Sequence, residues 1–374
     1  MTDLKYHRVL PTSNNLNGFK SYDTIDWLLT GPGRALVNNS ITIDFDLEVF
    51  VDGAGAAVAA ADDIKVNQHV AASSFFDQFQ TEIQNQGAIE NLQNYPRYCN
   101  MVNTATKCDN DCFNSQDIME GVAPLLSNGK YFLQAETLQS KTTVIKRTTH
   151  WAIRPKICFN RAQGGNFSFD KDGYIKVSTT LIRAASSVFG SKVDNTTNFT
   201  ISNISLRYQT IPKEQAVKQP LLMNSYISIK HLLTSSNNMI QATIPSSACS
   251  GCVVSFIAQA NESAVTKDSN RMEMVRAIDS LRFMFNSSLS ERITYELHDL
   301  KDMVAQGLGT MGQSGHNNVR FSNLKANDSW LIGLDFKAYL DLSSTNFHMN
   351  IDLSRAIAAP MYAYMYFLNL IRLG

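Results

Sequence analysis

The sequence contains six cysteines, whose spacing raises the question of a metal or redox site. They are Cys99, Cys108, Cys112, Cys158, Cys249 and Cys252. Cys108 and Cys112 are separated by three residues, and Cys249 and Cys252 form a CxxC pair. Two such pairs could bind zinc, but they lie far apart and no histidine stands at ligand spacing beside either. The CxxC also lacks the βαβ surroundings of a redox motif. We therefore predict free thiols made in a reducing compartment, with no metal and no cofactor.

Other motifs that could support catalysis are also weak. The seven histidines are scattered, and neither a G-x-S-x-G elbow nor a G-x-x-x-x-G-K-[ST] phosphate loop occurs. Gly31-Pro-Gly33 is interpreted as a turn, and His150-Trp151 as strand packing. The run from Asp170 to Gly173 lacks the spacing of a calcium loop and is predicted to be an Asp-Gly hairpin turn. We expect no catalytic residues and no enzyme activity.

Acidic pairs give no stronger signal for a site. Asp62-Asp63 and the pair Glu296 and Asp299 are interpreted as solvated surface. The whole chain carries 33 basic and 33 acidic residues, which argues against sequence-independent binding of nucleic acid. No secretory signal is visible, and the longest apolar run, 356–370, is interrupted by Pro360.

Alternating strands are the dominant pattern in the chain. In Ile41–Val51, six apolar residues alternate with a mostly acidic set, which predicts a strand with one buried and one wet face. Phe75–Val102 and Ser280–Leu308 share the order strand, turn, strand, helix. Phe199–Ile211 and Met361–Leu373 are long alternating strands that end the two halves. This repeated order predicts a duplication.

A length of 374 residues suits two domains. The best linker is 212–220, a polar stretch bounded by prolines. We expect an N-terminal arm over 1–24, a first unit over 25–211 and a second unit over 221–374. Long loops at 52–64 and 261–272 are expected at one end of the units.

Many one-sided strands need a second sheet to cover their apolar faces. We therefore predict an all-β fold of two consecutive eight-stranded jelly-roll sandwiches, a double jelly roll, with short inserted helices. The segments DSWLIGLDFKAYLDL and NFHMNIDLSR are expected to be paired strands.

Four segments together resemble the double jelly-roll major capsid proteins of tailless icosahedral viruses, the lineage of membrane-containing phages and adenovirus hexons. They are LNGFKSYDTIDWLLT with NNSITIDFDLEVFV, then SSFFDQFQTEIQNQGAIENLQNY, NFTISNISLRYQTIP and APMYAYMYFLNLIRL. The resemblance covers most of the chain, although no segment is a diagnostic motif.

This resemblance implies a structural protein of the virion that assembles in the host cytoplasm as a pseudo-hexagonal homotrimer. Its short length points to a bacteriophage. Expected partners are neighbouring capsomers, penton and minor capsid proteins, but no sequence-specific nucleic acid. The N-terminal arm, with Lys5, His7 and Arg8, is expected to reach a neighbour or an internal membrane, a frayed terminus being the alternative.

The sequence is also compatible with two other functions. A minor capsid or penton-type protein would use one unit at the shell and project the other. A carbohydrate-binding β-sandwich protein would need a surface row of Trp or Tyr. The three tryptophans, Trp27, Trp151 and Trp330, all fall in expected strands, which weakens that interpretation.

Overall fold

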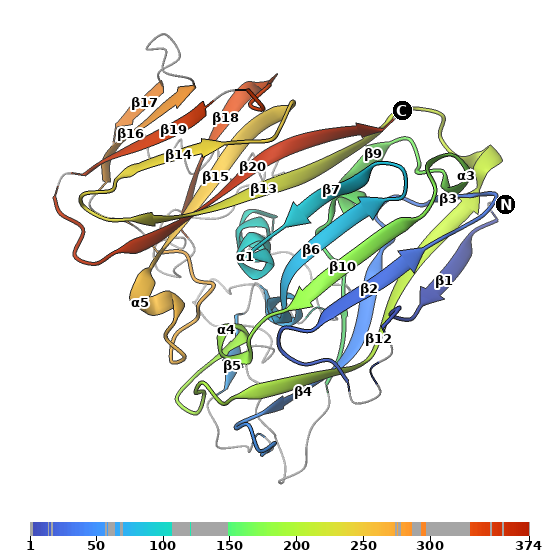
Figure 1. Cartoon of the computed structure of the whole chain (residues 1–374), viewed down its shortest axis with the longest axis horizontal. Coiled ribbons are helices and arrows are strands. Elements are labelled where there is room, and N and C mark those ends of the chain that lie inside the picture. Colours follow the sequence, from blue (N-terminus) through green and yellow to red (C-terminus); the bar gives the residue numbers. More distant parts are fainter. Residues whose placement is uncertain are drawn as a thin grey trace.

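A computed structural model places two β-sandwiches side by side, with the N- and C-termini toward the same side of the molecule (Figure 1). It describes residues 3–56, 58, 64–106, 120, 149–285, 293–296 and 330–373, apart from gaps at 14, 16–17, 68–69, 274, 276–277, 345 and 354. Within this part of the chain, no helix is long and apolar enough to cross a membrane.

The first sandwich consists of two antiparallel sheets. One has the strand order β1-β12-β4-β8, with the short β3 also paired to β12, and the other has the order β2-β10-β6-β7. The bounds are β1 Lys5–Val9, β2 Thr24–Leu29, β3 Arg34–Leu36, β4 Thr42–Phe50, β6 Phe76–Ile83, β7 Gly87–Leu92, β8 Thr149–Ile153, β10 Ile175–Leu181 and β12 Asn198–Pro212.

The second sandwich repeats this arrangement with its own strands. Its sheets have the orders β13-β20-β15-β18 and β14-β19-β16-β17, and β9 from the first half extends the former sheet beside β13. The bounds are β13 Leu221–Leu233, β14 Met239–Thr243, β15 Cys249–Ala258, β16 Ile278–Phe285, β17 Ile293–Glu296, β18 Leu331–Leu340, β19 Asn346–Leu353, β20 Met361–Leu373 and β9 Ala162–Gly164.

The two halves have the same topology. Each half has eight main strands among the described residues, numbered here in chain order without the short β3, β5, β9 and β11. In each half the first main strand pairs with the eighth, the eighth with the third, and the third with the sixth. The second pairs with the seventh, the seventh with the fourth, and the fourth with the fifth. This is the order of a jelly roll, so the predicted all-β double jelly roll is confirmed.

Short elements connect or flank these sheets. β5 and β11 pair as a separate two-stranded ribbon. Their bounds, and those of the helices described, are β5 Lys65–Val66, β11 Val188–Phe189, α1 Tyr95–Thr106, α3 Phe169–Asp172, α4 Ala184–Ser187, α5 Gln259–Glu262, η1 Ala71–Phe75, η3 Cys158–Arg161 and η4 Lys213–Gln215. The helix expected near the end of Ser280–Leu308 lies outside the described residues.

The apolar face of β4 is buried as predicted, but the face expected to be wet is partly covered, since Asp44 is only 5% exposed. Ile43, Phe45 and Leu47 are at most 1% exposed and face the opposite sheet. On the other face, Asp44 pairs with Arg207 of β12. Burial of alternate apolar residues therefore fixes the register of β4, because a shift by one residue would bring the carboxylates into the core.

Three expectations about local structure were wrong. Residues 5–9, placed in the N-terminal arm by the sequence pattern, form β1 and pair with β12 from Lys5–Thr210 to Val9–Leu206. β18 and β19 are not partners, because β18 pairs with β15 in one sheet and β19 lies between β14 and β16 in the other. Phe169–Asp172 is a helical turn rather than a hairpin, and it ends at Gly173, whose φ is +86°.

Docking of β1 is centred on His7. Its ring stacks on Tyr208 with centroids 4.7 Å apart. Its Nε2 lies 2.9 Å from the Thr210 hydroxyl, and that hydroxyl also accepts a 2.7 Å hydrogen bond from Arg34 Nε. Burial, together with the nearby charges of Lys5 and Arg34, lowers the pKa of His7 below its ordinary value. The docked strand therefore favours the neutral imidazole.

The connection between the halves is sterically tight. β12 ends at Pro212 and β13 begins at Leu221, and we keep 212–220 as the proposed linker. Gln219 lies just before β13, and a Cβ added to Gly165 of the first half would lie 1.9 Å from its carbonyl oxygen. No side chain fits there, so glycine allows the first half to lie against the start of the second.

We expect Gly165→Ala to destabilise the protein by about 1–3 kcal/mol, the usual cost of forcing a group into filled space. Gly53→Ala is the matched control, because its nearest added contact would be an ordinary 3.7 Å. Urea denaturation of both variants measures the difference. Equal stability of the two variants would contradict the tight approach at Gly165.

We expect acid to release β1. The lowered pKa of His7 means that the undocked strand takes up a proton near the ordinary value of 6.5 while the docked strand resists it, so docking is favoured above this pH and weakens below it. Limited proteolysis of the N-terminal strand should rise between about pH 7.5 and about pH 5.5, by at most about tenfold per pH unit. His7→Phe keeps a ring on Tyr208 but cannot titrate. An unchanged pH response in this variant would exclude His7 as the cause.

Candidate functional site

Buried side chains of the two sandwiches form several hydrogen bonds where the sandwiches meet, here called the junction. Helix α1 lies between them (Figure 1). Asn94 precedes the helix with a φ of +51°, and its carbonyl accepts hydrogen bonds from the amides of Arg97 and Tyr98. Pro96 occupies the first turn, where its missing N–H costs no helical hydrogen bond. The helix therefore starts at a defined place and carries the next side chains into the second sandwich.

Arg97 connects α1 to the second sandwich. It is only 3% exposed, and its guanidinium donates to the carbonyls of Ser269 at 2.5 Å and Arg271 at 3.0 Å. The same group lies 4.3 Å from the ring centroid of Tyr364 in β20. Because the planar guanidinium donates two hydrogen bonds and also lies against a ring, it restricts the angle between α1 and the second sandwich more than a single contact could.

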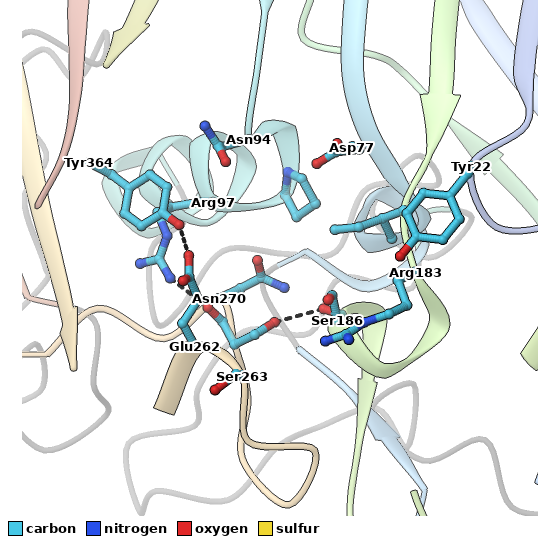
Figure 2. A pocket seen from close by; sticks show the side chains of 13 residues that line it. Tyr22, Asp77, Asn94, Arg97, Arg183, Ser186, Glu262, Ser263, Asn270 and Tyr364 are labelled. Atoms are coloured by element: carbon cyan, nitrogen blue, oxygen red, sulfur yellow. Dashed lines mark hydrogen bonds between the residues drawn. The ribbon is translucent and has the colours of Figure 1, made fainter. Parts of the chain in front are cut away.

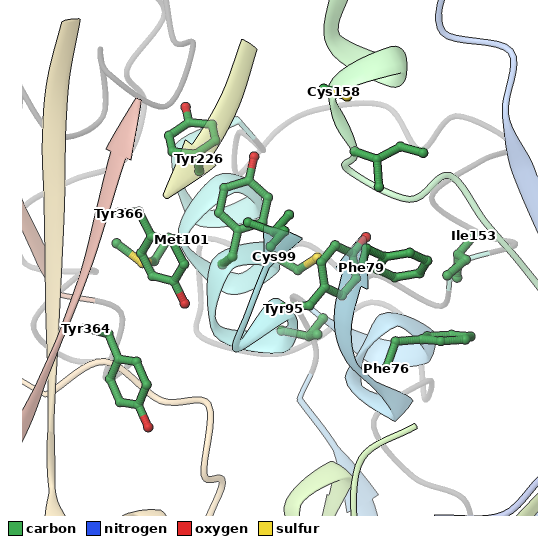
Figure 3. Close-up of a cluster of buried hydrophobic side chains, with 14 of the residues drawn as sticks. Phe76, Phe79, Tyr95, Cys99, Met101, Ile153, Cys158, Tyr226, Tyr364 and Tyr366 are labelled. Atoms are coloured by element: carbon green, nitrogen blue, oxygen red, sulfur yellow. The ribbon is translucent and has the colours of Figure 1, made fainter. Parts of the chain in front are cut away.

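Buried aromatic side chains of the two sandwiches meet around helix α1 (Figure 3). Tyr98 of α1 contacts Tyr226 of β13 and Tyr366 of β20, with ring centroids 4.9 and 5.6 Å apart. The Tyr366 hydroxyl donates to the carbonyl of Asn94 at 3.1 Å. These contacts therefore combine apolar burial with directional bonds that fix the halves relative to each other.

A buried ion pair forms the next contact. The Glu90 side chain in β7 is fully buried and lies 2.7 Å from the Arg161 guanidinium. Glu90 also accepts a 2.7 Å hydrogen bond from the amide of Cys158. Arg161 in turn donates to the carbonyl of Asn224 in β13 at 2.9 Å and lies 5.0 Å from the Tyr226 ring centroid. Burial raises the pKa of Glu90, and the adjacent Arg161 charge opposes this shift.

The segment 261–272, expected as a loop at one end of the sandwich, packs against the first half. Ser269 donates to the carbonyl of Ser186 at 2.7 Å, and Asn100 of α1 donates to the carbonyl of Asn270 at 2.7 Å. Asp268 accepts a hydrogen bond from Asn67. This loop therefore extends the junction at the end of the molecule away from the termini.

The cysteines are not brought together as a metal site. Cys99, Cys158, Cys249 and Cys252 are buried free thiols, and Cys108 and Cys112 lie outside the described residues. Burial raises the pKa of Cys99 and of Cys249 to about 12, which disfavours the reactive thiolate. No group of three potential metal ligands occurs in the part of the chain that the structure describes.

The remaining candidates from the sequence have structural partners. His150 lies 2.8 Å from Asp46 at the surface, whereas Trp151 is 8% exposed. Asp170 accepts a 2.7 Å hydrogen bond from the amide of Gly33 and pairs with Lys213 at 2.9 Å. Asp62, Asp63 and Asp299 lie outside the described residues, and Glu296 ends β17.

The residues of the junction were missed by the sequence interpretation. Arg97 and Glu90 lie in a segment rich in polar residues that ends in a helix, so their charge does not distinguish them in the sequence. Their partners stand far away along the chain, and Arg97 and Ser269 are 172 positions apart. Nothing local in the sequence identifies such partners.

We expect Arg161→Met to destabilise the protein by about 3–5 kcal/mol, because it leaves the Glu90 carboxylate buried without its cation. Adding Glu90→Gln should recover part of this loss. Lys213→Met is the control, since it breaks a pair whose two side chains are 52% and 35% exposed and should cost about 1 kcal/mol or less. Urea denaturation compares the three proteins, and equal losses for Arg161→Met and Lys213→Met would contradict a buried charge at Glu90.

Comparison by sequence finds no match to a family model or to a curated protein. Comparison by structure finds strong similarity. The Faustovirus major capsid protein matches with a TM-score of 0.62 at 8% identity, over 100% of this chain and 90% of that one. VP54 of PBCV-1, in a structure fitted into a reconstruction of the virophage Sputnik, matches with a TM-score of 0.59 at 11% identity, over 100% and 95% of the two chains.

A chain in the cryo-EM structure of the Sputnik virophage matches with a TM-score of 0.54 at 11% identity, over 99% of this chain and 85% of that one. At such low identity the similarity concerns the path of the backbone rather than particular residues. The matches extend through both sandwiches, as the coverage shows. The chain therefore has the double jelly-roll fold of the viral major capsid proteins.

Proposed function

We propose that this chain is a major capsid protein that assembles as a pseudo-hexagonal homotrimer and tiles an icosahedral virus shell. The observation that carries the proposal is the repeat of one strand order in two sandwiches of a single chain. Three such chains around a threefold axis present six similar sandwiches, an outline close to a hexagon. The fold shared with viral capsid proteins along almost the whole chain supports the same role.

The junction gives the proposal a physical basis. A tile repeats the same contacts only if the angle between its two sandwiches is constant from copy to copy. Arg97 and Arg161 connect the sandwiches through hydrogen bonds, and Tyr98 packs between them. A closed ring of identical chains uses head-to-tail contacts, in which one surface of a chain meets a different surface of its neighbour.

Exposed apolar side chains are available for such contacts. Tyr6 and Leu10, on one face of the N-terminal strand, are 71% and 65% exposed. In the second sandwich, Met239 of β14 and Tyr339 of β18 are 43% and 62% exposed. Large exposed apolar side chains on both sandwiches are compatible with heterologous association.

The proposal includes a place and partners. The protein would be a non-enzymatic component of the virion, assembled in the host cytoplasm, with bacteriophage as the proposed virus type. It would contact neighbouring capsomers, penton and minor capsid proteins. The outer face of β1, with Tyr6 and Leu10, would meet a neighbour or an internal membrane.

The alternatives receive less support. A penton-type or minor capsid protein would project its second unit, whereas here the second sandwich shares a buried junction with the first. A protein that binds carbohydrate through a row of tryptophans is disfavoured, because Trp27 and Trp330 are fully buried.

We expect the purified protein to have a solution mass about three times the 41.6 kDa of the chain, and to form hexagonal particles in electron micrographs. A stable monomer or a pentamer would overturn the proposal.

Arg97→Lys keeps the charge but loses the planar guanidinium that donates to two carbonyls, and should lower the trimer fraction several-fold. Arg355→Lys, at an exposed position, is the control. Analytical ultracentrifugation measures both variants, and unaltered trimerisation of Arg97→Lys would contradict the role of the junction.

A further inference from the structure

A cleft lies at the junction and is lined by both sandwiches (Figure 2). Its volume is about 340 Å³, within the range of about 300–1,000 Å³ typical of sites for small molecules. The first half contributes Tyr22, Asp77 and Arg183, and the second contributes Asn270 and Tyr364. The structural role described above explains the walls of this cleft but does not use its interior.

Several polar groups in the cleft have no bonding partner among the described residues. Asn270 is 6% exposed, and its backbone is bonded to Asn100 and Asp268, whereas its side-chain amide forms no hydrogen bond within this part of the chain. Figure 2 shows this amide directed into the cleft. An amide that faces a cleft without a partner among the described residues is open to hydrogen bonds from a ligand.

Two charges in the cleft are also available. Within the described residues, neither the carboxylate of Asp77 nor the guanidinium of Arg183 forms a hydrogen bond or an ion pair. By contrast, Glu262 is bonded to Lys230 and to the Tyr364 hydroxyl, and Arg97 to two carbonyls. Burial raises the pKa of Asp77, and the charge of Lys230 opposes this shift.

Backbone strain also occurs at this cleft. Tyr22 has a φ of +71° and Asn94 a φ of +51°, and both line it. The left-handed region is unfavourable for tyrosine, and such strain tends to occur at functional sites. Tyr22 is 69% exposed, and its ring stands opposite that of Tyr364 across the cleft (Figure 2). The strain therefore holds an aromatic ring at the rim.

The lining excludes several classes of ligand. Two cationic and two anionic side chains balance each other, which is unsuited to phosphates or nucleic acid. No set of three metal ligands occurs among the described residues. Pro96 and Ile182 are the aliphatic side chains of the described lining, too few to anchor an apolar peptide. Amides, hydroxyls, an open carboxylate, an open guanidinium and a rim aromatic suit an uncharged polyhydroxy compound.

We propose that this cleft binds a short, uncharged saccharide. Sugar hydroxyls would donate to the Asp77 carboxylate and to the side-chain oxygen Oδ1 of Asn270, and would accept from the Arg183 guanidinium and the side-chain nitrogen Nδ2 of Asn270. The Tyr22 ring would cover a C–H face of the sugar. This inference does not depend on the proposed capsid role, because the cleft is formed within one chain.

Saturation-transfer NMR on the purified full chain tests the proposal. The probes are glucose, galactose, mannose, N-acetylglucosamine and their disaccharides, with free amino acids and short peptides as the competing class. We expect saturation transfer to at least one sugar and none to the competing class. If none of the sugars shows saturation transfer, or if only the peptides or amino acids show it, the proposal is wrong.

Substitutions of residues that line the cleft test whether the sugar binds there. Asp77→Asn removes the open charge, and Tyr22→Asn removes the ring while allowing the left-handed backbone. Each should weaken sugar binding by about tenfold, a loss typical of one good contact. Tyr339→Asn, at a tyrosine 62% exposed on β18, is the matched control and should bind normally. Thermal unfolding checks that all three variants fold. Unaltered sugar affinity in folded Asp77→Asn and Tyr22→Asn would place the site elsewhere and refute the proposal.

Discussion

The structure depends on one constraint, the fixed orientation of two sandwiches whose buried apolar side chains form one continuous cluster. Two separate cores joined by an exposed linker would by default move relative to each other. Here Arg97 and Arg161 connect them through hydrogen bonds, and Tyr98 packs between them. Opening the junction would break these hydrogen bonds and expose the buried tyrosine rings to water, so the closed arrangement is favoured.

This constraint explains why a polar junction serves better than an apolar one. An apolar interface would allow the two sandwiches to shift relative to each other, because the hydrophobic effect depends on the buried area and not on direction. Forked hydrogen bonds to particular carbonyls hold only at one angle. The two carbonyls bonded by Arg97 and the close approach at Gly165 bring the same two halves together at separate points. A container built from many copies needs such a fixed angle, because small errors add up around a shell.

The same junction leaves a cleft at the end of the molecule away from the termini. Its walls are held by the bonds that orient the sandwiches, so its geometry is preorganised. Duplication therefore has two consequences. It provides the repeated sandwiches from which a hexagonal outline can be built, and it creates a boundary between them where side chains from both halves meet. Asn270 and Tyr22 belong to opposite walls of this boundary.

The sequence by itself determined the sandwiches. The alternation in Thr42–Phe50 predicted the buried face of β4, and the long strands that end each half were predicted at Phe199–Ile211 and Met361–Leu373. These features depend on the period of side chains along a strand, which is local. The sequence failed for residues 5–9, because a polar strand at a sheet edge has no buried face to reveal it.

Only the tertiary structure decided the junction, the strand partners and the cleft. Arg97 bonds to Ser269 across 172 positions of the chain, and β18 and β19 are neighbours in sequence but lie in different sheets. Such contacts depend on where the chain returns in space. That path is set by the packing of whole sheets, so no short stretch of residues encodes it.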